Sequence, residues 1–201
     1  MNIRLLALLF IFTAMPSMAA SPIHQSDTYA VERAAIIQSL QRGSSFISKN
    51  QTYQYLPEVR AVRLKSDNEP LQQALQRVGE TATQHIETKG PYALYRGAQR
   101  AAAQTDRNQD NESYPSVLNA RTGIIGIMPG TIEVKPRSMG AVAAIAAGHN
   151  LTVVREFAHL NVVYYQTKPG QDVLAVANAL AADPLVSSAE IEVIEHLAVP
   201  Y

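Results

Sequence analysis

The last third of the chain switches between hydrophobic patterns of period two and of helical period. In "GTIEVKP" (residues 130–136), Ile132 and Val134 alternate with charged residues, which is typical of a half-buried strand. "SMGAVAAIAAGHN" (138–150) then places apolar residues at helical spacing behind Ser138, a residue type that caps helices. This part of the chain is therefore predicted to begin with a strand followed by a helix.

The same patterns continue to the end of the region. Two β-branched and aromatic runs, residues 151–157 and 161–167, are joined by "AHLN" and predict a hairpin. Residues 169–184 predict a second helix, capped by Gln171 or Asp172 and stopped by Asp183-Pro184. "VSSAEIEVI" (186–194) predicts a closing strand, with two acidic side chains facing away from its apolar ones. The order strand, helix, strand, strand, helix, strand indicates a ferredoxin-like βαββαβ domain, an antiparallel sheet with both helices on one face.

The part of the chain before this domain has a different pattern of apolar and polar residues. Helical spacing occurs over residues 26–43 and 67–90, and a weaker helical pattern covers residues 91–104. Residues 52–64 fit a strand or an irregular segment, because Pro57 interrupts any longer pattern. We therefore expect an α+β protein in which a mainly helical region, residues 21–104, precedes the ferredoxin-like domain.

The stretch "TDRNQDNESYPS" (105–116) contains almost no apolar residues. Such a composition indicates an exposed segment, either a linker between domains or a long surface loop inside one domain. The expected division is a signal peptide (1–20), the helical region (21–104), a linker (105–116) and the C-terminal domain (117–201).

The first twenty residues have the layout of a signal peptide. Arg4 precedes an apolar run, and small residues follow Pro16. The apolar run is shorter than the ~20 residues that span a bilayer, which disfavours a membrane anchor. Cleavage is expected after Ala19 or Ala20, leaving a periplasmic or secreted protein.

Composition excludes several classes of function. The 17 basic and 17 acidic residues cancel, so net charge does not favour a nucleic acid or a membrane surface as partner. The absence of cysteine excludes disulfides, metal-thiolate sites and cysteine nucleophiles.

No catalytic constellation stands out in the remaining residues. The five histidines include no pair at the i, i+4 spacing of a helical zinc site. Ser44 and Ser45 lack the Gly-x-Ser-x-Gly setting of a nucleophile. The acidic run Glu190, Glu192 and Glu195 fits a solvated strand face better than an acid/base site. The sequence therefore predicts a binding protein with no cofactor and no metal, not an enzyme.

Residues 115–201 resemble the N-terminal propeptides of subtilisin-like serine proteases. The similar features are the charged opening strand, the Ala-rich first helix and, most specifically, "LAADPLVSSAEIEV" (180–193), a helix ending in Asp-Pro before the closing strand. With an added N-terminal part and no protease behind it, the chain is similar to the separately encoded external chaperones of Aeromonas-type, kexin-like subtilases.

The resemblance implies a partner and two contact regions. The partner is a subtilisin/kexin-like serine protease, bound in a 1:1 complex, whose folding and maturation the chain assists and which it inhibits. The sheet face opposite the helices would dock on the protease, with Glu156, Glu190 and Glu192 as candidates for capping helix N-termini on the partner.

The segment after the last strand would lie extended in the protease's active-site cleft. Its residues are Glu195, His196, Leu197, Ala198, Val199, Pro200 and Tyr201. Tyr201 would stand nearest the catalytic serine, where kexin-like enzymes prefer a basic residue, so this tail departs from the pattern.

Two other functions fit the same residues. One is a protease inhibitor without a folding role. The other is an envelope binding module that uses the ferredoxin-like fold for a purpose unrelated to proteases, because such a common fold does not define function.

Overall fold

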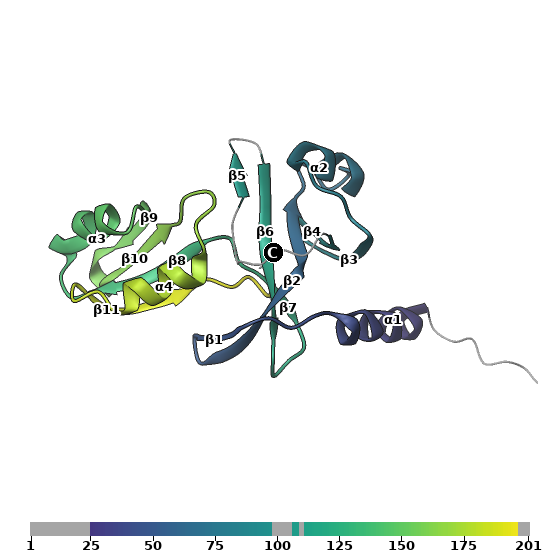
Figure 1. Cartoon of the computed structure of the whole chain (residues 1–201), viewed down its shortest axis with the longest axis horizontal. Helices are drawn as coiled ribbons and strands as arrows, with labels where there is room; N and C mark the ends of the chain where they lie inside the picture. Colours follow the sequence, from purple (N-terminus) through teal and green to yellow (C-terminus); the bar gives the residue numbers. More distant parts are fainter. Residues whose placement is uncertain (1–24, 98–105, 109–110, 197–201) are drawn as a thin grey trace, which may run out of the picture.

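Two antiparallel sheets of unequal size make up the protein, with helices packed against them (Figure 1). The computed structural model describes residues 25–97, 106–108 and 111–196. The larger, N-terminal sheet has seven strands in the order β3-β4-β2-β6-β5, with β1 paired to β2 and β7 paired to β6. The smaller, C-terminal sheet has four strands in the order β11-β8-β10-β9.

The N-terminal sheet is built around the long strand β2. Its side chains are buried almost continuously from Tyr53 to Val62, since both faces of this strand are covered. The pairing of β2 with β6 shifts register between Leu56 and Arg60, at Pro57, which has no N–H to donate to the ladder. The elements of this part are α1 (Gln25–Ser39), β1 (Ser45–Ser48), β2 (Gln51–Arg63), α2 (Leu71–Val78), β3 (Gln84–Lys89), β4 (Tyr92–Arg96), β5 (Asp106–Asn108), β6 (Asn111–Asn119) and β7 (Ile125–Ile127).

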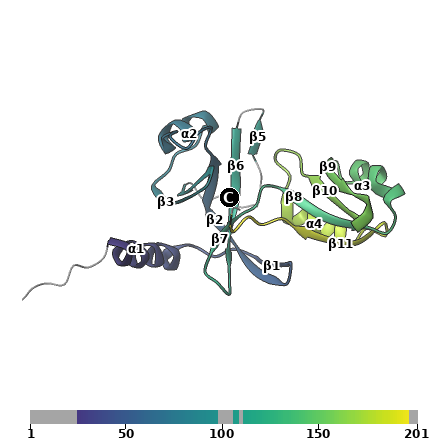
Figure 2. The same cartoon turned by 180° about the vertical axis from the view of Figure 1, so that it is seen from behind.

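Helix α1 extends away from the sheets, as Figures 1 and 2 show from opposite sides. Its last turns contact the body of the protein through the partly buried Ile36 and Ile37 and through an ion pair of 2.8 Å between Arg33 and Glu87 of β3. Among the described residues, no helix is long and apolar enough to cross a membrane.

The prediction of a mainly helical region over residues 21–104 is wrong for the part of it that the structure describes. Helix α2 ends at Gly79, whose φ of 68° is left-handed, and residues 84–89, predicted as its continuation, form β3 instead. The helix predicted over residues 91–104 is replaced in its described part by β4. A short apolar run such as "YALYR" fits a buried strand or a buried helix equally well, and pairing with β2 and β3 decides between them.

The exposed linker predicted over residues 105–116 is also wrong where the structure describes it. Strand β5 and most of β6 lie in this stretch, and Ser113, Tyr114 and Ser116 are buried. The polar Ser113 is accommodated because its hydroxyl accepts a hydrogen bond from Nε of Arg60 at 2.8 Å. Strands β6 and β7 carry the N-terminal sheet past the boundary predicted at residue 117, and the C-terminal sheet begins at β8.

The elements of the C-terminal sheet follow the predicted order. They are β8 (Thr131–Pro136), α3 (Val142–Gly148), β9 (Thr152–Phe157), β10 (Val162–Gln166), α4 (Val173–Ala181) and β11 (Val186–Ile191), with short 3₁₀ turns at Met139–Ala141 and Ala158–Leu160. Ser138 and Asp172 both act as caps. The Ser138 hydroxyl accepts from the Gly140 N–H at the start of the 3₁₀ turn that leads into α3, and the Asp172 carboxylate accepts from the Leu174 N–H of α4 at 2.9 Å.

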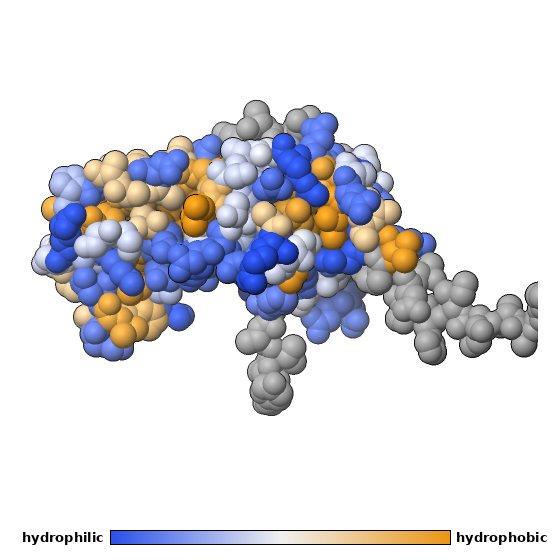
Figure 3. Space-filling model, turned by 90° about the horizontal axis from the view of Figure 1, so that it is seen from below, coloured by the Kyte–Doolittle hydropathy of each residue, from blue (hydrophilic) through white to orange (hydrophobic). Residues whose placement is uncertain are grey.

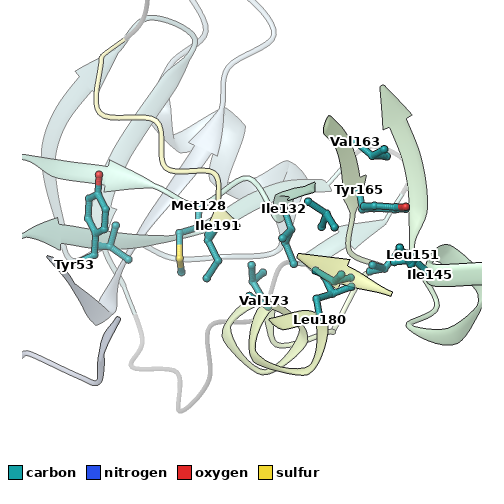
Figure 4. Packing of buried hydrophobic residues seen from close by; sticks show 14 of the residues in the cluster. Tyr53, Met128, Ile132, Ile145, Leu151, Val163, Tyr165, Val173, Leu180 and Ile191 are labelled. Atoms are coloured by element: carbon teal, nitrogen blue, oxygen red, sulfur yellow. The ribbon is translucent and has the colours of Figure 1, made fainter. Parts of the chain in front are cut away.

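One buried apolar cluster includes residues of both sheets. Tyr53 and Met128 from the N-terminal part join the residues that α3 and α4 cover in the C-terminal part. In Figure 4, Met128 and Ile191 lie between Tyr53 on one side and Ile132 on the other. The relative placement of the two sheets is thus maintained by the same apolar packing that stabilises each of them.

Candidate interaction surfaces

The face of the C-terminal sheet that α3 and α4 leave uncovered, called here the open face, carries a row of polar side chains. In the strand register, Glu190 of β11 lies opposite Glu133 of β8, which lies opposite Tyr164 of β10, which lies opposite Arg155 of β9. Side chains directly opposite on neighbouring strands share a face, so these four form one line across the sheet.

The two adjacent carboxylates in this row, Glu133 and Glu190, are both contacted by Lys49 from the N-terminal sheet. Lys49 and Asn50 have φ of 47° and 59°, which is typical of the two-residue type I′ turn that joins hairpins such as β1–β2. At this turn the Lys49 ammonium lies 3.0 Å from Glu133, and the Lys49 backbone N–H donates to Glu190. The Ser48 hydroxyl also donates to the carbonyl of Ile191 at 2.7 Å, so the hairpin tip rests on the edge of the C-terminal sheet.

Glu133 has a perturbed acidity for a clear physical reason. Burial alone would raise the pKa of its carboxyl, but hydrogen bonds from Lys49 and from the Tyr164 hydroxyl outweigh it and lower the pKa. The pKa of Lys49 is raised, since the attraction of Glu133 outweighs the effect of its own partial burial. The pair is therefore charged at neutral pH.

At the other end of the row, aromatic and apolar groups line a shallow hollow of about 290 Å³. Phe157 and Tyr164 meet edge to face with ring centroids 5.9 Å apart, and the Arg155 guanidinium lies 5.7 Å from the centroid of Phe157. Val154 stands beside them with 57% of its surface exposed. An arginine next to aromatic and apolar side chains is the composition that protein interfaces favour.

Other large apolar side chains are exposed, each on a different element or loop of the fold. Figure 3 views the molecule from below and shows small hydrophobic groups separated by hydrophilic residues on that side. Isolated exposed apolar residues are normal on a protein surface, so the open face is distinguished by its combination of groups. The exposed large hydrophobic residues described are Val31, Ile47, Val154, Leu160 and Leu185.

The three acidic residues predicted to dock are divided between two faces. Glu190 and Glu192 lie on the open face, and Glu192 lines the hollow. Glu156 is opposite Val163, which is fully buried beneath the helices, so Glu156 projects from the edge strand on the helical side. The structure brings together the first two and separates the third from them.

The segment after β11, which starts the predicted tail, leaves the C-terminal sheet and joins the N-terminal one. Ile194 pairs with Ile127 of β7 through two backbone hydrogen bonds of 2.9 and 3.0 Å. The Glu195 carboxylate accepts from the Asn119 amide at 2.7 Å, and its backbone carbonyl accepts from the Lys89 ammonium at 3.3 Å. His196 is exposed. The other predicted tail residues, Leu197, Ala198, Val199, Pro200 and Tyr201, lie outside the described residues.

Sequence reasoning did not single out Lys49, Lys89 or Asn119. The one available signal was the pair Lys49-Asn50 between two β-like stretches, since asparagine tolerates positive φ in hairpin turns. Nothing in the sequence connects Lys89 or Asn119 with residue 195. In the part of the chain that the structure describes, no group of three or more histidine or acidic side chains is placed to hold a metal ion.

Comparison with known proteins identifies the family. The model of the family described as "Open reading frame 2 N-terminal domain" matches residues 27–200. The chain belongs to this family. The matched residues belong to both sheets and include those of the open face and of the start of the tail.

Comparisons with individual proteins add little beyond this ORF2 N-terminal family. No protein of curated function matches the chain in sequence. A chain in the crystal structure of the Aeromonas sobria serine protease (ASP) and chaperone (ORF2) complex aligns with 79% of this chain and 100% of its own length, at 16% identity and a TM-score of 0.40. The aligned part is long, but the sequence identity and the TM-score are both low.

Proposed function

We propose that the protein is an exported chaperone of a subtilisin/kexin-like serine protease, which it helps to fold and then holds inactive in a 1:1 complex. The observation that carries the proposal is the open face, a β-sheet surface on which Arg155, Phe157 and Tyr164 line a hollow. The last strand of the same sheet, β11, continues into the tail. Family membership supports it, because the family shares the name ORF2 with the chaperone of the Aeromonas sobria protease complex.

We assign the unit from β8 to β11 as ferredoxin-like and propeptide-like. Its sheet order β11-β8-β10-β9, with a helix between β8 and β9 and another between β10 and β11, supports the assignment. In the subtilase propeptides that the sequence resembles, the sheet docks on the protease and the following segment enters the cleft. Here the open face would dock, and the segment beginning at Glu195 would enter the cleft.

A preformed sheet would assist folding for a physical reason. A subtilase depends on a large parallel sheet with many non-local contacts, which makes its folding slow. A partner that binds the forming structure lowers the barrier, and the same contacts then stabilise the native protease by mass action. Assisted folding and lasting attachment to the native protease therefore follow from the docked sheet, and the tail adds inhibition by occupying the cleft.

Export is part of the proposal. The signal-peptide pattern of residues 1–20 supports a periplasmic or secreted location, with cleavage after Ala19 or Ala20. N-terminal sequencing of the protein recovered from the cell envelope or the medium tests this directly, and an uncleaved N-terminus would contradict it.

The decisive experiment refolds the denatured protease with and without this protein. A chaperone raises the yield of native protease, measured after the inhibitor is removed or degraded, whereas a pure inhibitor leaves the yield unchanged. Inhibition of already folded protease is measured in parallel. An envelope module unrelated to proteases would give neither effect.

A further inference from the structure

Several contacts with the N-terminal sheet hold the segment that leads into the tail. Ile194 and Ile127 each donate a backbone N–H to the other's carbonyl, which forms a short antiparallel bridge beside β7. The Glu195 side chain accepts from Asn119, which is 2% exposed. The side-chain oxygen of Asn119, Oδ1, in turn accepts from the backbone N–H groups of Arg121 and Thr122, so the side-chain amide is fixed in orientation.

Lys89 joins this segment to the sheet from the other side. Its ammonium donates to the carbonyl of Ile125 in β7 and, at 3.3 Å, to the carbonyl of Glu195, and it lies 3.3 Å from the carboxylate of Glu87. An ammonium has three donors, and three acceptors surround this one. Lys89 therefore bridges β7 and the start of the tail.

Gly126 gives the tail segment its close approach to β7. A Cβ placed on this residue would lie 2.4 Å from Cγ1 of Val193, well inside van der Waals contact. Any larger residue at position 126 would push Val193 away from β7. The glycine is thus required by the contact between the two segments and not by its own backbone angles.

We propose that these residues form a tail clamp, by which the N-terminal sheet fixes the point and direction at which the tail leaves the molecule, with Lys89 as its main positioning residue. The inference rests on the proposed function, since it assigns the N-terminal sheet a role in presenting the inhibitory tail. The clamp consists of Lys89, Asn119, Gly126 and Ile127 holding Val193, Ile194 and Glu195.

The clamp matters because the protein would contact its partner at two places. When the open face is docked, the tail binds in an intramolecular step, whose effective concentration depends on where the tail starts. An extended chain spans at most ~3.3–3.6 Å per residue, so freeing residues 193–195 would move the start of the tail by up to ~10 Å. A released tail would find the cleft less often, while the docked sheet would still assist folding.

The test compares Lys89→Met with Lys89→Arg, which retains donors, and with Lys65→Met, an exposed lysine on the turn after β2. Each full-length variant is measured for its inhibition constant against the native subtilisin/kexin-like protease, for refolding yield of that protease, and for amide exchange at Ile194. For Lys89→Met we expect Ile194 to exchange at least tenfold faster and the inhibition constant to rise about tenfold, with refolding yield within twofold of wild type. Lys89→Arg should restore most of the inhibition, and Lys65→Met should change nothing.

A second variant, Gly126→Ala, perturbs the clamp without changing any charge. Gly126→Ala displaces Val193 by steric contact without removing a charge, and it should reproduce the same split between inhibition and refolding; urea unfolding checks that each variant is folded. Faster exchange at Ile194 with an unchanged inhibition constant overturns the clamp's role, and an Ile194 amide unprotected in the wild-type protein overturns the clamp itself. Wild-type protein that neither refolds nor inhibits the protease overturns the proposed function instead, whatever the exchange data show.

Discussion

Lys49, at the tip of the β1–β2 hairpin, forms a 3.0 Å ion pair with Glu133 at the centre of the C-terminal sheet. The contact joins the two halves of the molecule, because Lys49 belongs to the N-terminal sheet. Lys49 also neutralises the Glu133 carboxylate, which lies directly opposite Glu190 on the neighbouring strand. Two unscreened negative charges in these positions would destabilise the pairing of β8 with β11. The open face is therefore completed by a residue from the other sheet.

Replacing Lys49 by Met should reduce the free energy of unfolding by about 1 kcal/mol, as expected for a partly exposed ion pair that also separates two like charges. Urea unfolding measures the change, and Lys49→Arg should restore most of it. In a double-mutant cycle, Lys49→Met should cost much less when Glu133 is already Gln. Simple additivity of the two substitutions would show that the pair does not contribute.

Acid should destabilise the protein through carboxyls whose pKa is lowered in the folded state. Glu87 is an example: burial would raise its pKa, but hydrogen bonding and attraction from Arg33 and Lys89 outweigh this and lower it. A carboxyl with a lowered folded pKa contributes stability above its unfolded pKa of ~4.3, and this is lost as the pH falls through the folded value. The same direction of shift holds for Glu58, Glu69, Glu133 and Asp183.

The urea midpoint should thus be steady near neutral pH and fall steeply below pH ~4.3. Glu87→Gln should lower the midpoint at pH 7 and make its acid dependence shallower, while Glu32→Gln, on the exposed side of α1, should leave the midpoint at pH 7 as in wild type. A midpoint that rises on acidification would contradict the assignment.

The buried pair Arg60 and Glu80 should be the most sensitive charged site in the fold. Their side chains are 2% and 9% exposed, and the Arg60 Nε lies 3.3 Å from the Glu80 carboxylate. The Ser113 hydroxyl accepts a hydrogen bond from Arg60 and donates one to Glu80. Arg60→Met should cost about 3–5 kcal/mol, because it leaves a buried carboxylate without its counter-charge. Chemical denaturation checks this against Arg121→Met, an exposed arginine whose loss should cost less than about 0.5 kcal/mol. A similar small cost at both positions would refute the prediction.

The C-terminal sheet could be predicted from sequence because its elements are locally consistent. Strands β8 and β11 alternate, and β9 and β10 are rich in β-branched and aromatic residues. Ser138 caps the 3₁₀ turn that leads into α3, Asp172 caps α4, and no element depends on a distant segment to define its type. The face of Glu190 and Glu192 also followed from the alternation of β11 alone.

The N-terminal sheet could not be predicted in this way, since distant pairing determines its strands. Strand β6 is polar enough to suggest an exposed linker, yet it lies beside β2 with Ser113 and Ser116 buried, and the Ser113 hydroxyl is bonded to Arg60. The same limit hid the tail clamp: Lys89 and Glu195 are 106 residues apart, and only the folded chain brings them together.

Arg155 offers the sharpest test of the open face as the docking surface. Its guanidinium is exposed and lies over Phe157, so Arg155→Ala should leave thermal unfolding unchanged while weakening binding of the protease at least tenfold, as expected for an arginine at the centre of an interface. Because this contact is independent of the tail, the substitution should lower refolding yield as well as inhibition, unlike Lys89→Met. Titration of the protease by calorimetry measures the affinity, with Arg42→Ala, an exposed arginine beyond the end of α1, as the matched control. If both arginine variants bind as tightly as wild type, the protease docks elsewhere.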